Sequence, residues 1–240
     1  MTRTALVTGG SRGIGAAICL ALQRQGVQVA ANYRGEVSNA ERFYAETGIP
    51  VFRWDVADAD ACTTGVAAVV ERLGPIDILV NNAGITRDAS ITNMSSEMWN
   101  EVIRTNLGGC FNMCKAVFPQ MKARAWGRIV NIGSINGQAG QFGQVNYSAA
   151  KAGIQGLTKA LAQEGARAGI TVNVVAPGYT DTEMVTAIPA KILEQIMARI
   201  PTQRLGRPEE VASAVAYLCH EESGQITGST LSINGGQHMY

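Results

Sequence analysis

The sequence predicts a doubly wound α/β fold, in which helices cover both faces of one parallel Rossmann-type sheet of about seven strands. Seven short runs rich in β-branched residues recur along the 240 residues, and longer helix-forming stretches separate them. A connection of that length between two strands requires a crossover and therefore a parallel sheet. No linker, repeat or charge block interrupts the alternation, so we expect a single domain that covers residues 1–240.

The boundaries of these elements can be taken in chain order. Gly26 and Gly74 each end a helix-forming run, because glycine is typical of a helix C-terminus. Pro208 indicates the start of a helix through His220, since proline suits the first helical turn. Residues 181–201 have no strand pattern, and we expect them to form a lid over the site. The expected strands are residues 4–8, 27–31, 51–54, 76–80, 128–132, 171–175 and 230–233.

Charge and composition exclude several classes of partner. Lys and Arg number 20 against 19 for Asp and Glu, so a net charge of +1 gives no electrostatic case for nucleic acid or an anionic membrane. No apolar run reaches the roughly 18 to 20 residues that cross a bilayer, so we expect a cytoplasmic protein. Five cysteines without paired spacing and two histidines argue against a metal site, and the thiols are expected to be buried apolar groups.

A glycine-rich turn follows the first expected strand. Residues 8–15 read T-G-G-S-R-G-I-G and run directly into a helical pattern. A glycine-rich turn alone is also typical of an ordinary turn, but glycines between a strand and a helix let backbone N–H groups approach a pyrophosphate. The context therefore favours a dinucleotide site, although the spacing is G-x-x-x-G-x-G. The residues expected to contact the cofactor here are Gly9, Ser11, Arg12, Gly13 and Ile14.

The end of the second strand predicts which dinucleotide binds. An acidic residue there would accept from a ribose 2'-hydroxyl, but the chain has Asn32-Tyr33-Arg34. Arg34 and Arg12 can together supply two guanidiniums to a 2'-phosphate, so we predict NADPH over NADH. The alternative is that Arg34 is a solvated loop charge and only Arg12 matters.

Two further strand ends carry small polar motifs. Asp55-Val56 follows the third strand and can accept from the adenine amino group, and Asn82, Ala83 and Gly84 follow the fourth and let backbone pass beneath the adenosine ribose. Each motif alone is more typical of a turn. Because both stand at C-terminal ends of strands, where a doubly wound sheet binds its ligand, we assign them to the cofactor site.

Tyr147 and Lys151 stand at positions i and i+4 of an expected helix, so their side chains share one face. An ammonium within roughly 4 to 6 Å favours the ionised phenol and lowers its pKa by about 1 to 3 units. Ser134 lies thirteen residues upstream, after the strand at 128–132, and can aim its hydroxyl at the same oxygen. The pair alone is a weak signal, but a hydroxyl and a phenol that converge suit a carbonyl or alcohol substrate.

Taken together, these residues resemble the classical short-chain dehydrogenase/reductases over essentially the whole chain. The resemblance implies that Tyr147 is the catalytic acid/base, that Ser134 orients the substrate oxygen, that Lys151 holds the nicotinamide ribose, and that Asn106 anchors a water. It further implies cofactor contacts from Pro177, Gly178, Thr180 and Thr182. The usual Asp-Gly-Gly near the C-terminus is Asn234-Gly-Gly here, which we expect to affect assembly more than chemistry. The motifs that carry the resemblance are residues 8–15, 81–84, Asn106, Ser134, Tyr147, Lys151, 177–178 and 234–236.

Within that family the chain looks most like the acetoacetyl-CoA reductases of polyhydroxyalkanoate synthesis. Residues 82–88, 126–131, 137–148 and 234–239 carry this likeness. The similar 3-oxoacyl carrier-protein reductases often have a basic residue before the glycines matching Gly127 and Gly169, where this chain has Trp126 and Ala168. That difference favours coenzyme A, although Arg124 and Arg167 are close by.

The resemblance implies hydride delivery to C3 of a 3-oxoacyl thioester and an (R)-3-hydroxyacyl product. Asp88, Gln141, Phe142, Gln144 and Tyr179, together with Ser134 and Tyr147, are the expected substrate contacts, and the alternative for the glutamines is a solvated loop. Two other functions stay open, namely a non-catalytic NADP-binding sensor and a reductase of a sugar, steroid or other ketone. Family members pair helices near 95–124 and 147–168 across subunits, so we expect a homotetramer.

Overall fold

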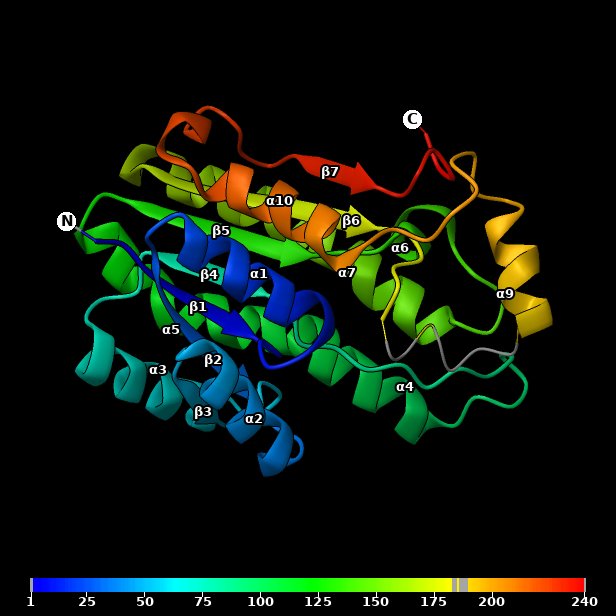
Figure 1. Cartoon of the computed structure of the whole chain (residues 1–240), viewed down its shortest axis with the longest axis horizontal. Helices are drawn as coiled ribbons and strands as arrows, with labels where there is room; N and C mark the ends of the chain where they lie inside the picture. Colours follow the sequence, from blue (N-terminus) through cyan, green and yellow to red (C-terminus); the bar gives the residue numbers. More distant parts are fainter. Residues whose placement is uncertain (1, 183–184, 186–189, 240) are drawn as a thin grey trace.

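Seven strands of the described residues form one parallel sheet, as the sequence predicts, and their order is β3-β2-β1-β4-β5-β6-β7. The computed structural model describes residues 2–182, 185 and 190–239. In Figure 1 the strands run side by side through the middle of the molecule, and α6 and α9 lie beyond one end of them. The strands are β1 (Thr4–Thr8), β2 (Gln28–Tyr33), β3 (Val51–Arg53), β4 (Ile78–Asn81), β5 (Gly127–Ile132), β6 (Ile170–Pro177) and β7 (Thr230–Ile233).

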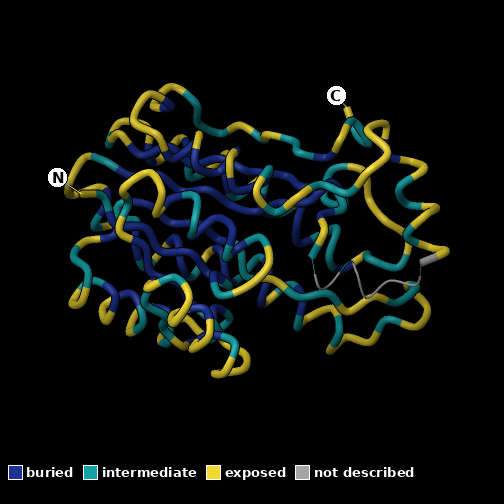
Figure 2. Tube along the Cα trace, viewed as in Figure 1, coloured by how far each residue is buried: buried dark blue, intermediate teal, exposed yellow. Residues whose placement is uncertain are grey.

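Helices cover both faces of this sheet, because its strands alternate apolar side chains up and down. Ala5 and Val7 pack with α1, α2 and α10 on one face, and Leu6 packs with α3, α5 and α7 on the other. Buried backbone therefore runs through the centre and exposed residues lie on the outer helices, as Figure 2 shows. The helices are α1 (Gly13–Arg24), α2 (Val37–Thr47), α3 (Ala59–Leu73), α4 (Ser96–Val102), α5 (Gly109–Ala123), α6 (Ile135–Ala139), α7 (Val145–Gly165), α9 (Ala190–Met197) and α10 (Pro208–Cys219), with a π-turn, η1 (Ile103–Gly108), between α4 and α5.

The helix limits that the sequence predicts at Gly26, Gly74 and Pro208 agree with these bounds, and the structure adds a side-chain cap that the sequence analysis did not name. Asp58 caps α3 by accepting hydrogen bonds from the backbone N–H groups of Asp60 and Ala61. Pro208 occupies the first turn of α10, and Glu210 accepts from the backbone N–H of Arg207 at its start. Helix α10 ends at Cys219, one residue earlier than predicted.

Neighbouring strands explain the small differences from the expected strand limits. Strand β2 continues to Tyr33 because it pairs with β1 on one side and with β3 on the other. Residues 183–184 and 186–189 of the expected lid lie outside the described residues, while α9 occupies part of the remainder. Among the described residues, no helix is both long and apolar enough to cross a membrane.

The sheet places every strand's carboxyl end at one edge. From β1 the chain crosses to β2 and β3 on one side, and it then returns to β4 on the other side of β1. The strand order therefore reverses between β1 and β4, and a crevice opens there at the carboxyl ends of the strands. This topology sets where a ligand site can form.

Candidate active site

A cavity of about 820 Å³ lies at the carboxyl edge of the sheet. Residues after β1, β2, β3, β4, β5 and β6 line it, together with the start of α7. It gathers all of the residues that the sequence predicts for the cofactor, namely Gly9, Ser11, Arg12, Gly13, Ile14, Arg34, Asp55, Val56, Asn82, Ala83, Gly84, Tyr147, Lys151, Pro177, Gly178, Thr180 and Thr182.

The glycine-rich turn is held open by close backbone packing. Gly9 has a φ of 60°, a left-handed conformation that glycine adopts without strain. A Cβ at Gly15 would collide with the carbonyl oxygen of Gly9 and lie 2.6 Å from Nδ2 of Asn82. The turn therefore brings the start of α1 against Asn82, directly after β4, and leaves the first residues of α1 at the cavity wall, the arrangement that binds a pyrophosphate. The residues present fit a dinucleotide.

Thr8 ties this turn to the motif after β4. Its hydroxyl oxygen accepts from the backbone N–H groups of Asn82 and Ala83, both at 3.0 Å. The amide Nδ2 of Asn82 donates in return to the carbonyls of Thr8 and Gly9. The sequence predicted no role for Thr8, although it stands directly before the first glycine of the motif. The two motifs form one wall of the cavity.

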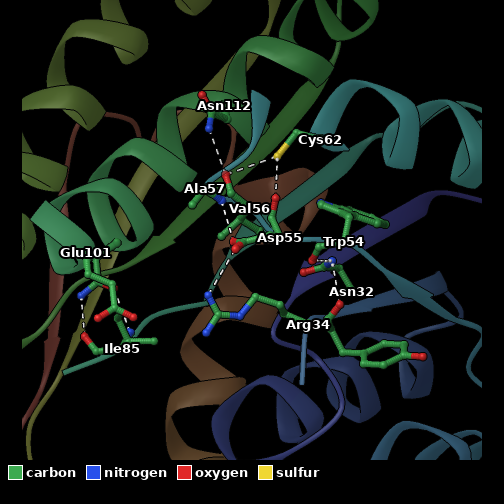
Figure 3. A network of polar contacts seen from close by, with 12 residues as sticks. Asn32, Arg34, Trp54, Asp55, Val56, Ala57, Cys62, Ile85, Glu101 and Asn112 are labelled. Atoms are coloured by element: carbon green, nitrogen blue, oxygen red, sulfur yellow. Dashed lines mark hydrogen bonds and ion pairs between the residues drawn. The ribbon is translucent and has the colours of Figure 1, made fainter. Parts of the chain in front are cut away.

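At the other end of the cavity, Arg34 and Asp55 lie against each other (Figure 3). The guanidinium Nη1 of Arg34 donates to Oδ2 of Asp55 at 3.2 Å, and the backbone N–H of Ala57 donates to Oδ1 at 2.9 Å. Both side chains are partly exposed, so the ion pair contributes little to stability. Its consequence is geometric, because it holds the predicted phosphate-binding cation beside the predicted adenine-binding carboxylate.

The turn at Val56 is held from behind by two helices (Figure 3). Asn112 of α5 donates through Nδ2 to the carbonyl oxygen of Val56 at 2.9 Å, and the thiol of Cys62 in α3 donates to the same oxygen at 3.4 Å. A Cβ at Gly109 would lie 2.8 Å from the Val56 side chain, so α5 packs directly on this turn. The adenine end of the cavity is therefore rigidly supported.

Tyr147, Lys151 and Ser134 meet at the opposite end of the cavity. The Nζ atom of Lys151 lies 5.6 Å from the centre of the Tyr147 ring, within the range expected for the helical pair. Ser134 is buried, and its hydroxyl oxygen accepts from the backbone N–H of Asn136 at the start of α6. Because this N–H occupies an acceptor position of Ser134, the hydroxyl hydrogen is available to donate.

Lys151 is buried and held by a backbone carbonyl. Its ammonium donates to the carbonyl oxygen of Ile132, at the end of β5, at 2.7 Å. A Cβ at Gly137 would lie only 2.7 Å from the backbone of Lys151, so α6 packs tightly onto α7 there. The position of Lys151 is set by both the strand end and this helix contact.

Asn106 is fully buried inside the π-turn η1. Its Oδ1 accepts from the backbone N–H of Ile85 at 2.8 Å, and its Nδ2 donates to the carbonyl of Ile85 at 2.9 Å. Both polar atoms of the Asn106 side chain therefore form hydrogen bonds with the backbone of the loop after β4. A π-turn leaves backbone groups outside the regular helical pattern and is frequent at functional sites.

The structure places the predicted substrate contacts in two groups. Ser134 and Tyr147 line the cavity, whereas Asp88, Gln141, Phe142, Gln144 and Tyr179 do not. Gln144 donates to Asp88 at 2.8 Å, and Phe142 is 89% exposed. Burial, followed by the nearby Asp88 carboxylate, raises the pKa of the Tyr179 phenol. These five residues surround the site without entering the cavity, and their role stays a prediction.

Asn146 is a site residue that sequence reasoning missed. It is fully buried, and its Nδ2 donates to the carbonyls of Arg87 and Met98, while its Oδ1 accepts from the backbone N–H of Tyr147. Its place directly before Tyr147 was the only signal in the sequence. Asn146 joins the loop after β4 to the helix that carries Tyr147.

Neither a metal cluster nor a disulfide is found in the part of the chain that the structure describes. The five cysteines are buried free thiols, and burial raises the pKa of the Cys110 thiol to about 11. They are packing residues, as the sequence predicts.

Comparison with known proteins gives matches along the entire chain. A family model described as Enoyl-(Acyl carrier protein) reductase matches residues 9–238. An acetoacetyl-CoA reductase of Rhizobium meliloti is 62% identical and covers 100% of both chains, and one of Shinella zoogloeoides is 60% identical and covers 99% of both. A 3-oxoacyl-[acyl-carrier-protein] reductase of Staphylococcus aureus is 44% identical over 100% of this chain and 99% of its own length.

Proposed function

This chain belongs to the short-chain dehydrogenase/reductase family, and we propose that it reduces acetoacetyl-CoA to (R)-3-hydroxybutyryl-CoA with NADPH. The observation that carries the proposal is the cavity that holds a dinucleotide cradle at one end and Ser134, Tyr147 and Lys151 at the other. Relatives named acetoacetyl-CoA reductase are 48 to 62% identical to the chain. These names favour a coenzyme A thioester as the substrate.

The proposed chemistry divides among three side chains. When bound, a reduced nicotinamide supplies a hydride to C3 of the thioester. Ser134 donates its hydroxyl hydrogen to the C3 oxygen, because its own oxygen already accepts from Asn136. Tyr147 then transfers its phenolic proton to that oxygen as the negative charge develops. Lys151 keeps a positive charge beside the tyrosine, and the Ile132 carbonyl holds it there.

Preference for NADPH is proposed from the charges near β2. Arg34 and Arg12 line the cavity where the adenosine ribose would lie, and no carboxylate occupies the end of β2 itself. Arg34 has five N–H donors, and its bond to Asp55 leaves others available for a phosphate. The ion pair therefore supports phosphate binding by fixing the guanidinium at the cavity wall.

We favour coenzyme A over a carrier protein because the arginines near Gly127 already have partners within the chain. Arg124 donates to the carbonyl of Ile76 and pairs with Asp77, and the guanidiniums of Arg3 and Arg128 lie 3.7 and 4.5 Å from the centre of the Trp126 ring. The basic residue typical of the carrier-protein reductases is replaced by this tryptophan, and Arg124 is committed elsewhere. The carrier-protein reductase stays the second candidate, on the similarity to the Staphylococcus aureus enzyme.

The decisive experiment follows NADPH absorbance with acetoacetyl-CoA and, side by side, with its carrier-protein thioester. We expect faster turnover of acetoacetyl-CoA and loss of turnover in Tyr147→Phe with NADPH binding retained. Faster turnover of the carrier-protein thioester would support the second candidate. NADPH binding without reduction of any carbonyl would support a sensor and reject the enzyme.

We further propose a cytoplasmic homotetramer. Exposed aromatic side chains on α5 and α10, Phe111 and Tyr217, and the exposed Gly156 on α7, which has no neighbour within 4 Å of an added Cβ, suit contact with further copies. Five free thiols suit a reducing compartment. Light scattering that gives the mass of a monomer, 25.4 kDa, would contradict the assembly, and cell fractionation tests the location.

A further inference from the structure

Asn136 contacts both ends of the segment that carries the two proposed catalytic oxygens. Its backbone N–H donates to Oγ of Ser134 at 3.1 Å, and its side-chain Nδ2 donates to Oε1 of Gln144 at 2.8 Å. Ser134 lies two residues before it, and Gln144 directly precedes α7, three residues before Tyr147. One residue therefore links the serine to the first turn of the tyrosine helix.

The loop between these two ends is exposed at its tip, and a backbone hydrogen bond from the N–H of Ala89 to the carbonyl of Gly143 ties it to the loop after β4. Gly140 and Gly143 have φ values of 74° and 80°, and Gln141 and Phe142 between them are exposed. A glycine-containing exposed loop does not by itself fix the separation of the elements it joins. The bond between Asn136 and Gln144 closes the loop across its base, and together with the packing of α6 on α7 at Gly137 it sets that separation.

The donors and acceptors of this bond can point in only one direction. Gln144 donates through Nε2 to Oδ2 of Asp88 at 2.8 Å. An ionised carboxylate only accepts hydrogen bonds, so Gln144 has to present its NH₂ group to Asp88 and its oxygen to Asn136. Asn136 must then present its own NH₂ group to Gln144. The carboxylate of Asp88 thus sets the orientation of both amides.

On the basis of the function proposed above, we propose that Asn136 is a positioning residue for the reduction. It acts through the chain Asp88–Gln144–Asn136, which holds the hydroxyl of Ser134 and the phenol of Tyr147 at a fixed spacing around the substrate oxygen. Asp88, Gln144 and Asn136 do not line the cofactor cavity. Their loss is therefore expected to slow the chemical step while NADPH binding is preserved.

The fixed direction of the hydrogen bonds from Asn136 to Gln144 and from Gln144 to Asp88 allows a sharp test. Asn136→Asp keeps the shape of the side chain but removes its NH₂ donor, and it places a second carboxylate opposite Oε1 of Gln144. The amide of Gln144 has one NH₂ group and one oxygen, so it cannot donate to a carboxylate on each side. The hydrogen-bond network from Asp88 to position 136 is therefore broken. We expect kcat at saturating substrate and NADPH to fall about tenfold or more, since small displacements at a reacting centre cost rate steeply.

Exchanging the carboxylate and the amide between positions 88 and 136 should restore the hydrogen-bond network. In the double variant Asp88→Asn with Asn136→Asp, the new amide at position 88 becomes the donor and the new carboxylate at position 136 becomes the acceptor. Gln144 satisfies both by turning its amide over. We expect kcat to recover most of the loss of Asn136→Asp. A residue that only fills space would show no such reciprocity, because each substitution preserves size.

Gln225→Glu is the matched control, because it makes the same amide-to-carboxylate change at an exposed position before β7, at the opposite edge of the sheet. It should keep the wild-type kcat. Thermal unfolding and the Kd for NADPH are measured for every variant. If Asn136→Asp does not fold, Asn136→Ala and the double variant provide the comparison, with the same expected loss and recovery.

Two results would overturn the proposal. One is a wild-type kcat for Asn136→Asp, or for Asn136→Ala where the first does not fold. The other is a double variant no faster than the single one. Each rate is taken relative to wild type on whichever carbonyl compound the wild-type protein reduces. Failure of acetoacetyl-CoA as a substrate therefore rejects the proposed function alone, and unchanged ratios reject the role of Asn136 alone.

Discussion

The tight contact between α6 and α7 predicts that Gly137→Ala disturbs Lys151. An added Cβ would lie 2.7 Å from both Cβ and the carbonyl carbon of Lys151, and ordinary contacts begin at 3.4 Å. One helix must therefore move by about 0.7 Å, the difference between these distances. Overpacking of this kind typically costs about 1 to 3 kcal/mol.

A displacement of that size also reaches the lysine's hydrogen bond. The Nζ atom of Lys151 is 2.7 Å from the carbonyl oxygen of Ile132. An additional 0.7 Å would take the bond beyond the usual upper limit of about 3.2 Å. Since misplacement by about 1 Å can cost up to 100-fold in rate, we expect kcat to fall by about 10- to 100-fold.

Steady-state kinetics and thermal unfolding of Gly137→Ala test this reasoning, with Gly224→Ala as the control. Gly224 has a φ of −62°, and a Cβ there would meet its nearest neighbour at 3.5 Å, so the control should retain activity and stability. A Gly137→Ala protein with both wild-type kcat and wild-type melting temperature would refute the account of how Lys151 is held.

Three further predictions concern other parts of the molecule. Arg34→Asp should raise the KM for NADPH about 10-fold or more relative to that for NADH, because a charge-assisted bond to phosphate contributes about 1.5 to 3 kcal/mol, and equal changes in both KM values would defeat the assignment. Asn146→Ala should lower the melting temperature and kcat together, because the carbonyls of Arg87 and Met98 lose their hydrogen-bond donor. Each unsatisfied buried group costs about 1 to 3 kcal/mol. An unchanged melting temperature would argue against this role of Asn146. The hydrogen bond from Arg204, then that from the Arg207 backbone, lowers the pKa of Glu210 from 4.5 to about 2, so its stabilisation is present above pH 4.5 and is lost as the pH falls through 2. Glu210→Gln should therefore melt at a lower temperature at pH 7 and lose less stability than wild type between these pH values, as calorimetry at several pH values would reveal.

Local motifs were sufficient to predict which residues come together around the cavity. The glycine turn after β1 and the Asn82-Ala83-Gly84 motif after β4 each depend on a strand end and a few adjacent residues. A parallel sheet brings all strand ends to one edge, so predicting the strands also placed these motifs together. The same reasoning gave the Tyr147 and Lys151 pair, because helical spacing alone fixes which side chains share a face.

Contacts between distant side chains could not be predicted in this way. The ion pair of Arg34 with Asp55 and the hydrogen bond of Gln144 to Asp88 join residues 21 and 56 positions apart. Their partners depend on how loops from different strands settle against each other, which no local pattern encodes. For the same reason, the exposure of Phe142 outside the cavity could not be predicted, and its contact with substrate stays a prediction.

Strand order has a consequence for synthesis of the chain. Strand β1 is made first, yet one of its two sheet neighbours is β4, which ends at Asn81, and the cavity wall is completed only by residues beyond β6. A nascent polypeptide on the ribosome thus carries β1 with an unpaired, apolar edge until β4 has been made, a state prone to aggregation. Nucleotide can therefore stabilise the fold fully only after the residues through Val185 have been made, because they complete the lining of the cavity.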